Sequence, residues 1–126
     1  MKQNIQTDNA PKAIGTYSQA IKVDNTVYLS GQIGLDPKTM ELVSNDFSEQ
    51  AEQVMKNIIA VADAVDCNLG DVVKFNVYLM DMNDFAKLNK VFEKYLTEPY
   101  PARAAIQVSA LPKGALIEID GVISSD

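Results

Sequence analysis

Histidine is absent from this 126-residue chain, and cysteine occurs once, at Cys67. Without an imidazole there can be no histidine metal site, no Ser-His-Asp triad and no imidazole general base. A single cysteine allows no intrachain disulfide, which favours a reducing compartment, and we expect Cys67 to be a half-buried neutral thiol. Any chemistry must therefore come from carboxylates, guanidinium groups, hydroxyls or the backbone.

Positive charge and long apolar runs are also scarce. Eleven Lys and Arg residues stand against seventeen Asp and Glu residues, a net charge of −6. An acidic chain repels phosphate, which argues against a general nucleic-acid partner and against a polybasic membrane-surface protein. No apolar run approaches the ~20 residues that cross a bilayer, and the residues after Met1 lack the apolar centre of a signal peptide. We therefore expect a cytoplasmic protein with no membrane partner.

The remaining composition is that of a globular chain, with 47% hydrophobic and 22% charged residues. The length suits one domain, and no linker or internal repeat divides it, so residues 1–126 are expected to form a single domain.

Apolar residues recur every three or four positions in two segments, which predicts two helices. The first runs from about residue 46 to 65. Asp46 begins a capping-box pattern at its start, and Gly70 is the expected stop signal. The second begins near residue 84 and is ended by Pro99.

Alternating apolar and polar residues predict strands in the remaining chain. Four clear segments are Val27–Ile33, Val73–Met80, Arg103–Val108 and Leu116–Ile123, and two weaker ones are Asn4–Gln6 and Gln19–Val23. In the segment Val73–Met80, the side chain of Val73 is expected on the same face as that of Phe75. The order β-β-β-α-β-α-β-β predicts an α+β fold in which two helices cover one face of a six-stranded sheet.

The uncovered face is expected to be of mixed polarity. Its expected members are Tyr28, Ser30, Gln32, Lys74, Asn76, Tyr78, Arg103, Gln107 and Glu118. Such a face is too polar for a second core and less polar than a fully solvated surface. A second copy of the chain could cover it, so homo-oligomerisation is a hypothesis.

Two charged residues on the predicted sheet are candidates for chemistry. The guanidinium of Arg103 has the planar donor geometry that matches a carboxylate, although it could equally be a surface arginine paired with an acid. Glu118 in a semi-enclosed setting could have a raised pKa and exchange protons, although it could equally be a solvated residue.

Two irregular stretches provide further candidates. Tyr17 lies in the Pro- and Gly-containing segment 10–20 and could close over a ligand, or the segment could be a packing strap. Ser30 has no histidine to activate it, so we interpret it as a hydrogen-bonding residue. Gly31 inside a strand permits a bulge or a close backbone approach.

Four motifs resemble the RidA/YjgF reactive-intermediate deaminase family: APKAIGTYSQA, VYLSGQIG, NDFAKLNKVFEKYL and YPARAAIQVSALPKGALIEID. The resemblance extends from about Asn9 to Val122. It implies a chorismate-mutase-like fold and a homotrimer with active sites in the clefts between subunits. It also implies hydrolysis of 2-imino acids or their enamine tautomers (2-aminoacrylate, 2-iminobutanoate, 2-iminopropanoate) to 2-keto acids and ammonia, without metal or cofactor. Such an activity protects pyridoxal-phosphate enzymes from these reactive compounds.

The same resemblance assigns roles to individual positions. It implies that Arg103 binds the substrate carboxylate and that Glu118 positions or activates the water. It places the remaining substrate-binding positions at Tyr17, Ser30, Gly31, Asn89 and the backbone around Ala105.

The sequence departs from the family pattern at Thr16, where proline is usual, at Ala105, where many members have cysteine, and at Asp120, where glutamate is common. Two alternative functions are open. One is a non-catalytic module that binds a small carboxylate such as a keto acid and regulates amino-acid metabolism. The other, an endoribonuclease, is disfavoured by the acidic charge and the absence of histidine.

Overall fold

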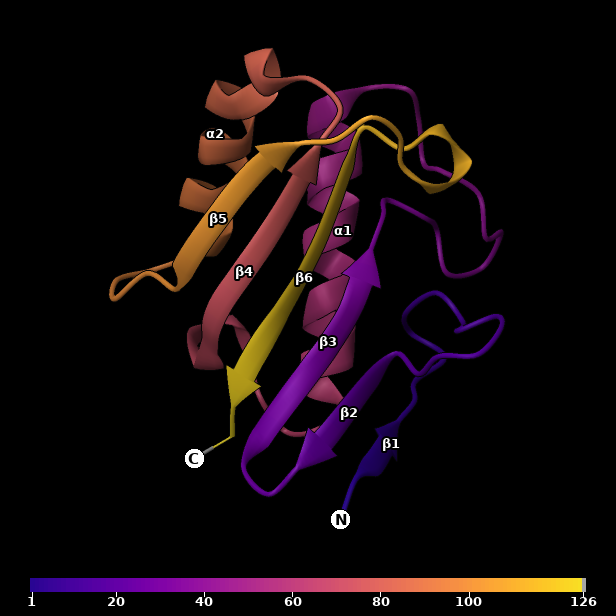
Figure 1. The fold of residues 1–126 in the computed structure, drawn as a ribbon, viewed down its shortest axis with the longest axis vertical. Coiled ribbons are helices and arrows are strands. Elements are labelled where there is room, and N and C mark those ends of the chain that lie inside the picture. The colour runs from indigo at the N-terminus through magenta and orange to yellow at the C-terminus, as the bar shows by residue number, and fades with distance from the viewer. Residues whose placement is uncertain (126) are drawn as a thin grey trace.

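A six-stranded sheet with two helices on one face forms the fold of this computed structural model, which describes residues 1–125 (Figure 1). The strands lie in the order β1-β2-β3-β6-β4-β5, and all neighbours are antiparallel except β4 and β5, which are parallel. The elements are β1 (Gln3–Ile5), β2 (Ala20–Val23), β3 (Thr26–Gln32), α1 (Phe47–Asp63), β4 (Val72–Leu79), α2 (Phe85–Tyr95), β5 (Ala102–Gln107) and β6 (Ile117–Ser124). The predicted order of strands and helices is confirmed.

Helix α1 begins as its sequence predicts and ends earlier. The Asp46 carboxylate accepts a hydrogen bond from the backbone N–H of Glu49 at 3.0 Å, which satisfies one of the free donors of the first turn. The helix stops at Asp63, and Asp66 then takes a left-handed conformation with φ of 58°. The prediction that Gly70 ends the helix is wrong, because Gly70 lies in a separate 3-10 turn that Asn68 caps.

The core lies between the helices and the inner face of the sheet. Val54, Met55 and Ile58 of α1 are almost completely buried, and the rings of Phe75 and Phe92 join β4 to α2 with centroids 5.7 Å apart. Each such side chain contributes about 1.5–3 kcal/mol through removal of its surface from water. Cys67 is more buried than predicted, and burial raises the pKa of its thiol, which keeps it protonated at neutral pH.

Two bulges reverse the faces predicted for particular residues. In β4 the pairing with β6 shifts between Val72 and Lys74, so Val72 is buried and Val73 is 49% exposed. In β3 the pairing shifts between Leu29 and Gln32, so Gln32 is buried on the helix side. The assignments of Val73 and Gln32 are therefore wrong, because one extra residue in a bulged strand inverts the alternation that follows.

Strand β5 also presents the opposite face to the one predicted. Arg103 and Gln107 are in register with the buried residues Phe75 and Leu79, which places them on the helix side of the sheet edge. Ala105 packs against the core from this side, and Ile106 is 52% exposed on the other. The expectation that Arg103 and Glu118 share the uncovered face is thus wrong.

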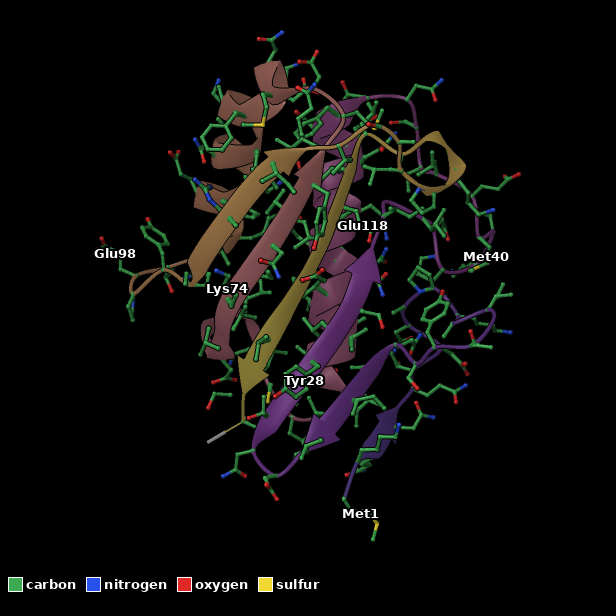
Figure 2. The ribbon with its side chains drawn as sticks, viewed as in Figure 1. Met1, Tyr28, Met40, Lys74, Glu98 and Glu118 are labelled. Carbon is green, nitrogen blue, oxygen red and sulfur yellow. The ribbon has the colours of Figure 1, made fainter. Side chains whose placement is uncertain are left out.

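The face without helices carries Tyr28, Lys74 and Glu118, which lie toward the viewer in Figure 2. Tyr78 and Asn76 alternate with the buried residues of β4 and share this face, which confirms its mixed polarity. We call it the open face. Within residues 1–125, neither helix has the length and apolar character needed to span a membrane.

The two helix N-termini give a matched test of the local structure. Asp46 caps α1 through a side-chain hydrogen bond, whereas Asp84 at the start of α2 makes no such bond. We expect Asp46→Ala to lower the free energy of unfolding by about 1 kcal/mol in urea titrations at fixed protein concentration. Asp84→Ala is the control and should cost less, because only an ion pair with the exposed Lys87 is lost. An equal or larger loss for Asp84→Ala would contradict the assigned cap.

Candidate active site

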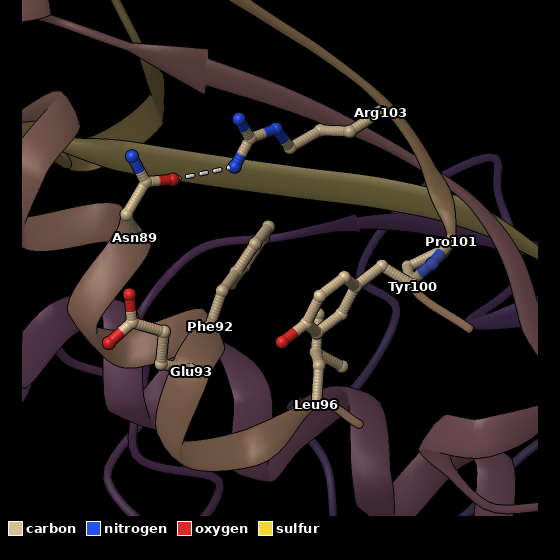
Figure 3. Close-up of a pocket in the computed structure, with 7 residues that line it drawn as sticks. All are labelled: Asn89, Phe92, Glu93, Leu96, Tyr100, Pro101 and Arg103. Atoms are coloured by element: carbon tan, nitrogen blue, oxygen red, sulfur yellow. Dashed lines mark hydrogen bonds between the residues drawn. The ribbon is translucent and has the colours of Figure 1, made fainter. Parts of the chain in front are cut away.

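Arg103 extends from the edge strand β5 over one face of α2 (Figure 3). Its Nη1 donates a hydrogen bond to Oδ1 of Asn89 at 2.8 Å. The guanidinium carbon lies 5.0 Å from the ring centroid of Phe85 and 5.7 Å from that of Phe92. The two ring contacts and the hydrogen bond to Asn89 together hold the Arg103 side chain in one orientation.

The spacing of α2 produces this platform. Phe85, Asn89 and Phe92 are four and three residues apart, so they project from one face of the helix. The pattern that makes this helix amphipathic therefore also supplies the two rings and the amide that contact the arginine. The sequence motifs pointed to Asn89 and Arg103, whereas the two phenylalanines were not singled out from the other regularly spaced apolar residues of the predicted helix.

Arg103 has no acidic partner among residues 1–125, where the ion pairs are Lys87–Asp84 and Lys94–Glu52. A pocket of about 510 Å³ lies beside it, lined by Asn89, Phe92, Glu93, Leu96, Tyr100, Pro101 and Arg103. A guanidinium has five N–H donors, and one bond to Asn89 leaves others for a ligand. The pocket can therefore bind a small carboxylate against a partly apolar wall.

Glu118 lies in β6 on the open face, opposite Tyr78 of β4. Its carboxylate is in contact with the backbone of Gly31, where an added Cβ would collide with Oε2 of Glu118. A side chain at position 31 would push this carboxylate aside, so glycine leaves Glu118 in its observed position. Burial, followed by the negative charge of Asp120, raises the pKa of Glu118 above that of an ordinary glutamate.

A second pocket, of about 620 Å³, has Glu118 in its wall. Its lining includes Tyr17, Ser30, Gly31 and Glu118, together with Lys12 and Lys113. The Ser30 hydroxyl donates to the carbonyl of Ser18 and so holds the segment that carries Tyr17. This agrees with the interpretation of Ser30 as a hydrogen-bonding residue, and the Tyr17 side chain is 55% exposed at this pocket.

Gln19 organises the same segment and was missed by sequence analysis. Its buried amide accepts from Thr7 N–H and donates to the carbonyls of Thr7, Ala10 and Pro11. These bonds satisfy backbone groups of a loop that has no sheet partner there. The partner carbonyls lie eight to twelve residues away, so no local pattern could have identified the contact.

The seven residues expected to form one site fall into two groups within the chain. Arg103 and Asn89 line the first pocket, Tyr17, Ser30, Gly31 and Glu118 line the second, and no residue lines both. Ala105 is half-buried on the helix side of β5, the side of Arg103. Strand β4 separates β5 from β6, and Arg103 and Glu118 project from opposite faces.

Within residues 1–125, the acidic residues and Cys67 do not gather in threes at any place that could hold a metal ion. The groups that face the two pockets are instead those of proton transfer and anion binding. They include the guanidinium of Arg103, the carboxylate of Glu118 with its raised pKa, and hydroxyl groups. The carboxylate of Glu93 and the ammonium groups of Lys12 and Lys113 also line the pockets.

Known proteins resemble the chain over almost its whole length. A family model described as Endoribonuclease L-PSP matches residues 7–124. A RutC family protein of Pyrococcus horikoshii is 53% identical, with 97% of each chain covered. The human protein named 2-iminobutanoate/2-iminopropanoate deaminase is 48% identical over 97% of this chain and 89% of its own length.

The solved structures agree with this relationship. The crystal structure of RidA from the Antarctic bacterium Psychrobacter sp. superposes with a TM-score of 0.94 at 61% identity, and covers 97% of this chain and 98% of that one. Together with the six-stranded sheet, the two helices and the full-length family match, this similarity shows that the chain belongs to the RidA/YjgF family.

Proposed function

We propose that this protein is a hydrolytic deaminase of small 2-imino acids and their enamine tautomers, such as 2-aminoacrylate, 2-iminobutanoate and 2-iminopropanoate. The observation that carries the proposal is the Arg103 guanidinium, which Asn89 and two aromatic rings hold at the first pocket. This guanidinium forms no ion pair within residues 1–125. The name of the human relative supports this class of substrate. The products would be a 2-keto acid and ammonia, and removal of the imine would protect pyridoxal-phosphate enzymes.

The mechanism requires placement and proton transfer. Arg103 binds the substrate carboxylate through two parallel hydrogen bonds, which fixes the neighbouring iminium carbon. A water oxygen adds to this carbon while Glu118 accepts the water proton, and a carbinolamine forms. Glu118 returns the proton to the nitrogen. The C–N bond then breaks as the carbinolamine hydroxyl becomes the carbonyl, and the hydroxyl proton passes to the departing ammonia, which leaves as ammonium. The pKa of Glu118 is raised above that of an ordinary glutamate, which makes it a stronger base toward water and suits a group that accepts and then donates a proton.

Such a reaction needs both pockets at one substrate, and one chain does not bring them together. We infer that a second copy contributes the missing half, so that Arg103 of one chain and Glu118 of the next line one cleft of a homotrimer. The open face, with Tyr28 and Ile106 about half exposed, is the surface on which copies would meet.

The tests described below also distinguish two alternative functions. A module that only binds keto acids would use Arg103 without turnover. An endoribonuclease, the description carried by the family model, fits poorly with a net charge of −6 and no histidine. We expect no cleavage of RNA at physiological salt.

The first test removes the guanidinium. Arg103→Ala should lower kcat/KM for an imine generated in situ by a threonine dehydratase by about 100-fold, because two charge-assisted hydrogen bonds to substrate are lost. Lys90→Ala removes the same charge from an exposed position of α2 and is the matched control, expected to retain activity. Equal rates of imine loss with the wild type and Arg103→Ala would refute the carboxylate clamp, and keto-acid binding without any wild-type turnover would favour the binding module.

The second test moves the carboxylate of Glu118. Gly31→Ala should displace it, because the new methyl group would occupy the position of Oε2, while the flexible side chain limits the cost to folding. We expect about a tenfold or greater loss of kcat with little change in melting temperature. Combined with Glu118→Gln, the alanine should cause little further loss, since both changes act on the same group. Additive losses in this double-mutant cycle would show that Gly31 acts independently of Glu118.

The third test asks whether two chains share a site. Arg103→Ala and Glu118→Gln proteins should each retain about 1% of wild-type activity or less, and joint refolding of equal amounts should restore about a quarter of wild-type activity in a cyclic trimer. Arg103→Ala refolded with the Arg103→Ala/Glu118→Gln double variant is the control and should stay at that residual level. Sizing in solution measures the assembly directly. A monomer with full activity, or mixtures that never regain activity, would be incompatible with the shared site.

A further inference from the structure

Asp120 follows Glu118 by two residues in β6, so both carboxylates lie on the open face. Each oxygen of Asp120 receives one hydrogen bond from β4. Asn76 Nδ2 donates to Oδ1 at 2.8 Å, and the hydroxyl of Tyr78 donates to Oδ2 at 2.9 Å. The register pairs Asn76 with Asp120 and Tyr78 with Glu118, so Tyr78 reaches diagonally across the strands.

This arrangement holds a second carboxylate beside the proposed base. Asp120 takes no part in the ion pairs of residues 1–125, so no cation there neutralises it at contact distance. The hydrogen bond to Asp120, then burial, raises the pKa of the Tyr78 hydroxyl, which therefore remains a donor at neutral pH. The two hydrogen bonds consequently hold a carboxylate on the open face, two residues along β6 from Glu118.

The titratable and charged groups around Glu118 come from several elements. Within the chain they are Asp120 of β6, Tyr78 of β4, and Lys12, Tyr17 and Lys113 of the loops that line its pocket, and in the proposed shared cleft Arg103 of the neighbouring copy joins them. Lys74 and Tyr28 also lie on the open face, but both pair with Val122, four residues along β6. Apart from burial, Asp120 is the group that acts on the Glu118 carboxyl, through repulsion between like charges.

We propose that Asp120 is a positioning residue for the reaction, whose fixed negative charge sets the basicity of Glu118, and that Asn76 and Tyr78 hold it there. The proposal rests on the deaminase function proposed above and adds a role for residues outside both pockets. Asp120 touches no substrate in this scheme and acts only through Glu118.

The consequence for pH follows from the sign of the interaction. Glu118 must be ionised to accept the proton of water, so activity is lost as the pH falls through its pKa. Repulsion by Asp120 makes ionisation of Glu118 harder. Loss of that charge therefore moves the acidic limb of the kcat profile to lower pH, and it weakens the base, so kcat on the plateau falls. KM should change little, because Arg103 is untouched.

The direct measurement is an NMR titration of the Glu118 side-chain carboxyl carbon in the full-length protein, with the signal assigned through its loss in Glu118→Gln. We expect the midpoint to fall in Asp120→Asn and in Asp120→Ser, which removes the charge without an amide. The midpoint should stay raised in Asp120→Glu, which keeps the charge. Asp63→Asn removes an equal charge from the exposed end of α1 and is the matched control, with no change expected.

The outcomes separate this inference from the proposed function. An unchanged midpoint in both folded charge-removing variants would overturn the role of Asp120. So would a plateau kcat equal to that of wild type, or a KM that rises while kcat is kept. A lowered midpoint in a protein whose wild type does not hydrolyse imines would support the coupling and refute the deaminase.

Discussion

The guanidinium of Arg103 lies against one face of α2, and the chemistry proposed for this protein depends on that contact. Asn89 accepts one hydrogen bond and the rings of Phe85 and Phe92 lie beneath the charge. A free arginine side chain would lose conformational entropy when it binds a ligand, and much of that entropy is already lost here through contacts within the chain. Because the acceptor is a neutral amide, the positive charge is oriented without being neutralised, and it remains available to a small anion.

The second constraint is the separation of charges across the sheet. Arg103 lies on the helix side of an edge strand, whereas Glu118 lies on the open face two strands away. Neighbouring strands are about 4.8 Å apart, so the backbones of β5 and β6 differ by about 10 Å before the opposite directions of the side chains are counted. A guanidinium and a carboxylate on neighbouring residues of one face would form an ion pair and occupy each other. Their separation within the chain prevents such an ion pair, and it is the observation on which the proposed site between copies rests.

Much of the fold could be predicted from local patterns, and each error has a physical origin. The apolar spacing of α1 and α2 identified both helices, and the Asp46 cap was found at the predicted residue. Val73 and Gln32 were assigned to the wrong faces because each follows an irregular pairing that shifts the alternation by one residue. Arg103 was misplaced for another reason. Alternation along β5 is real, but Ala104, Ala105 and Ile106 are too similar in polarity to show which side meets the helices.

The candidate residues were identified by motif, and their grouping was not. The sequence motifs contain the candidate residues Gly31, Asn89, Arg103 and Glu118. Each could be recognised because a close backbone contact, anion binding and proton transfer each require a particular type of side chain. The sequence alone therefore determined the order of helices and strands, the candidate functional side chains and the family resemblance. Tertiary structure decided that those groups form two pockets, that Gln19 anchors the Tyr17 segment, and that Asp120 is held beside Glu118. These facts depend on strand register and on contacts between residues far apart in sequence, which no local periodicity encodes.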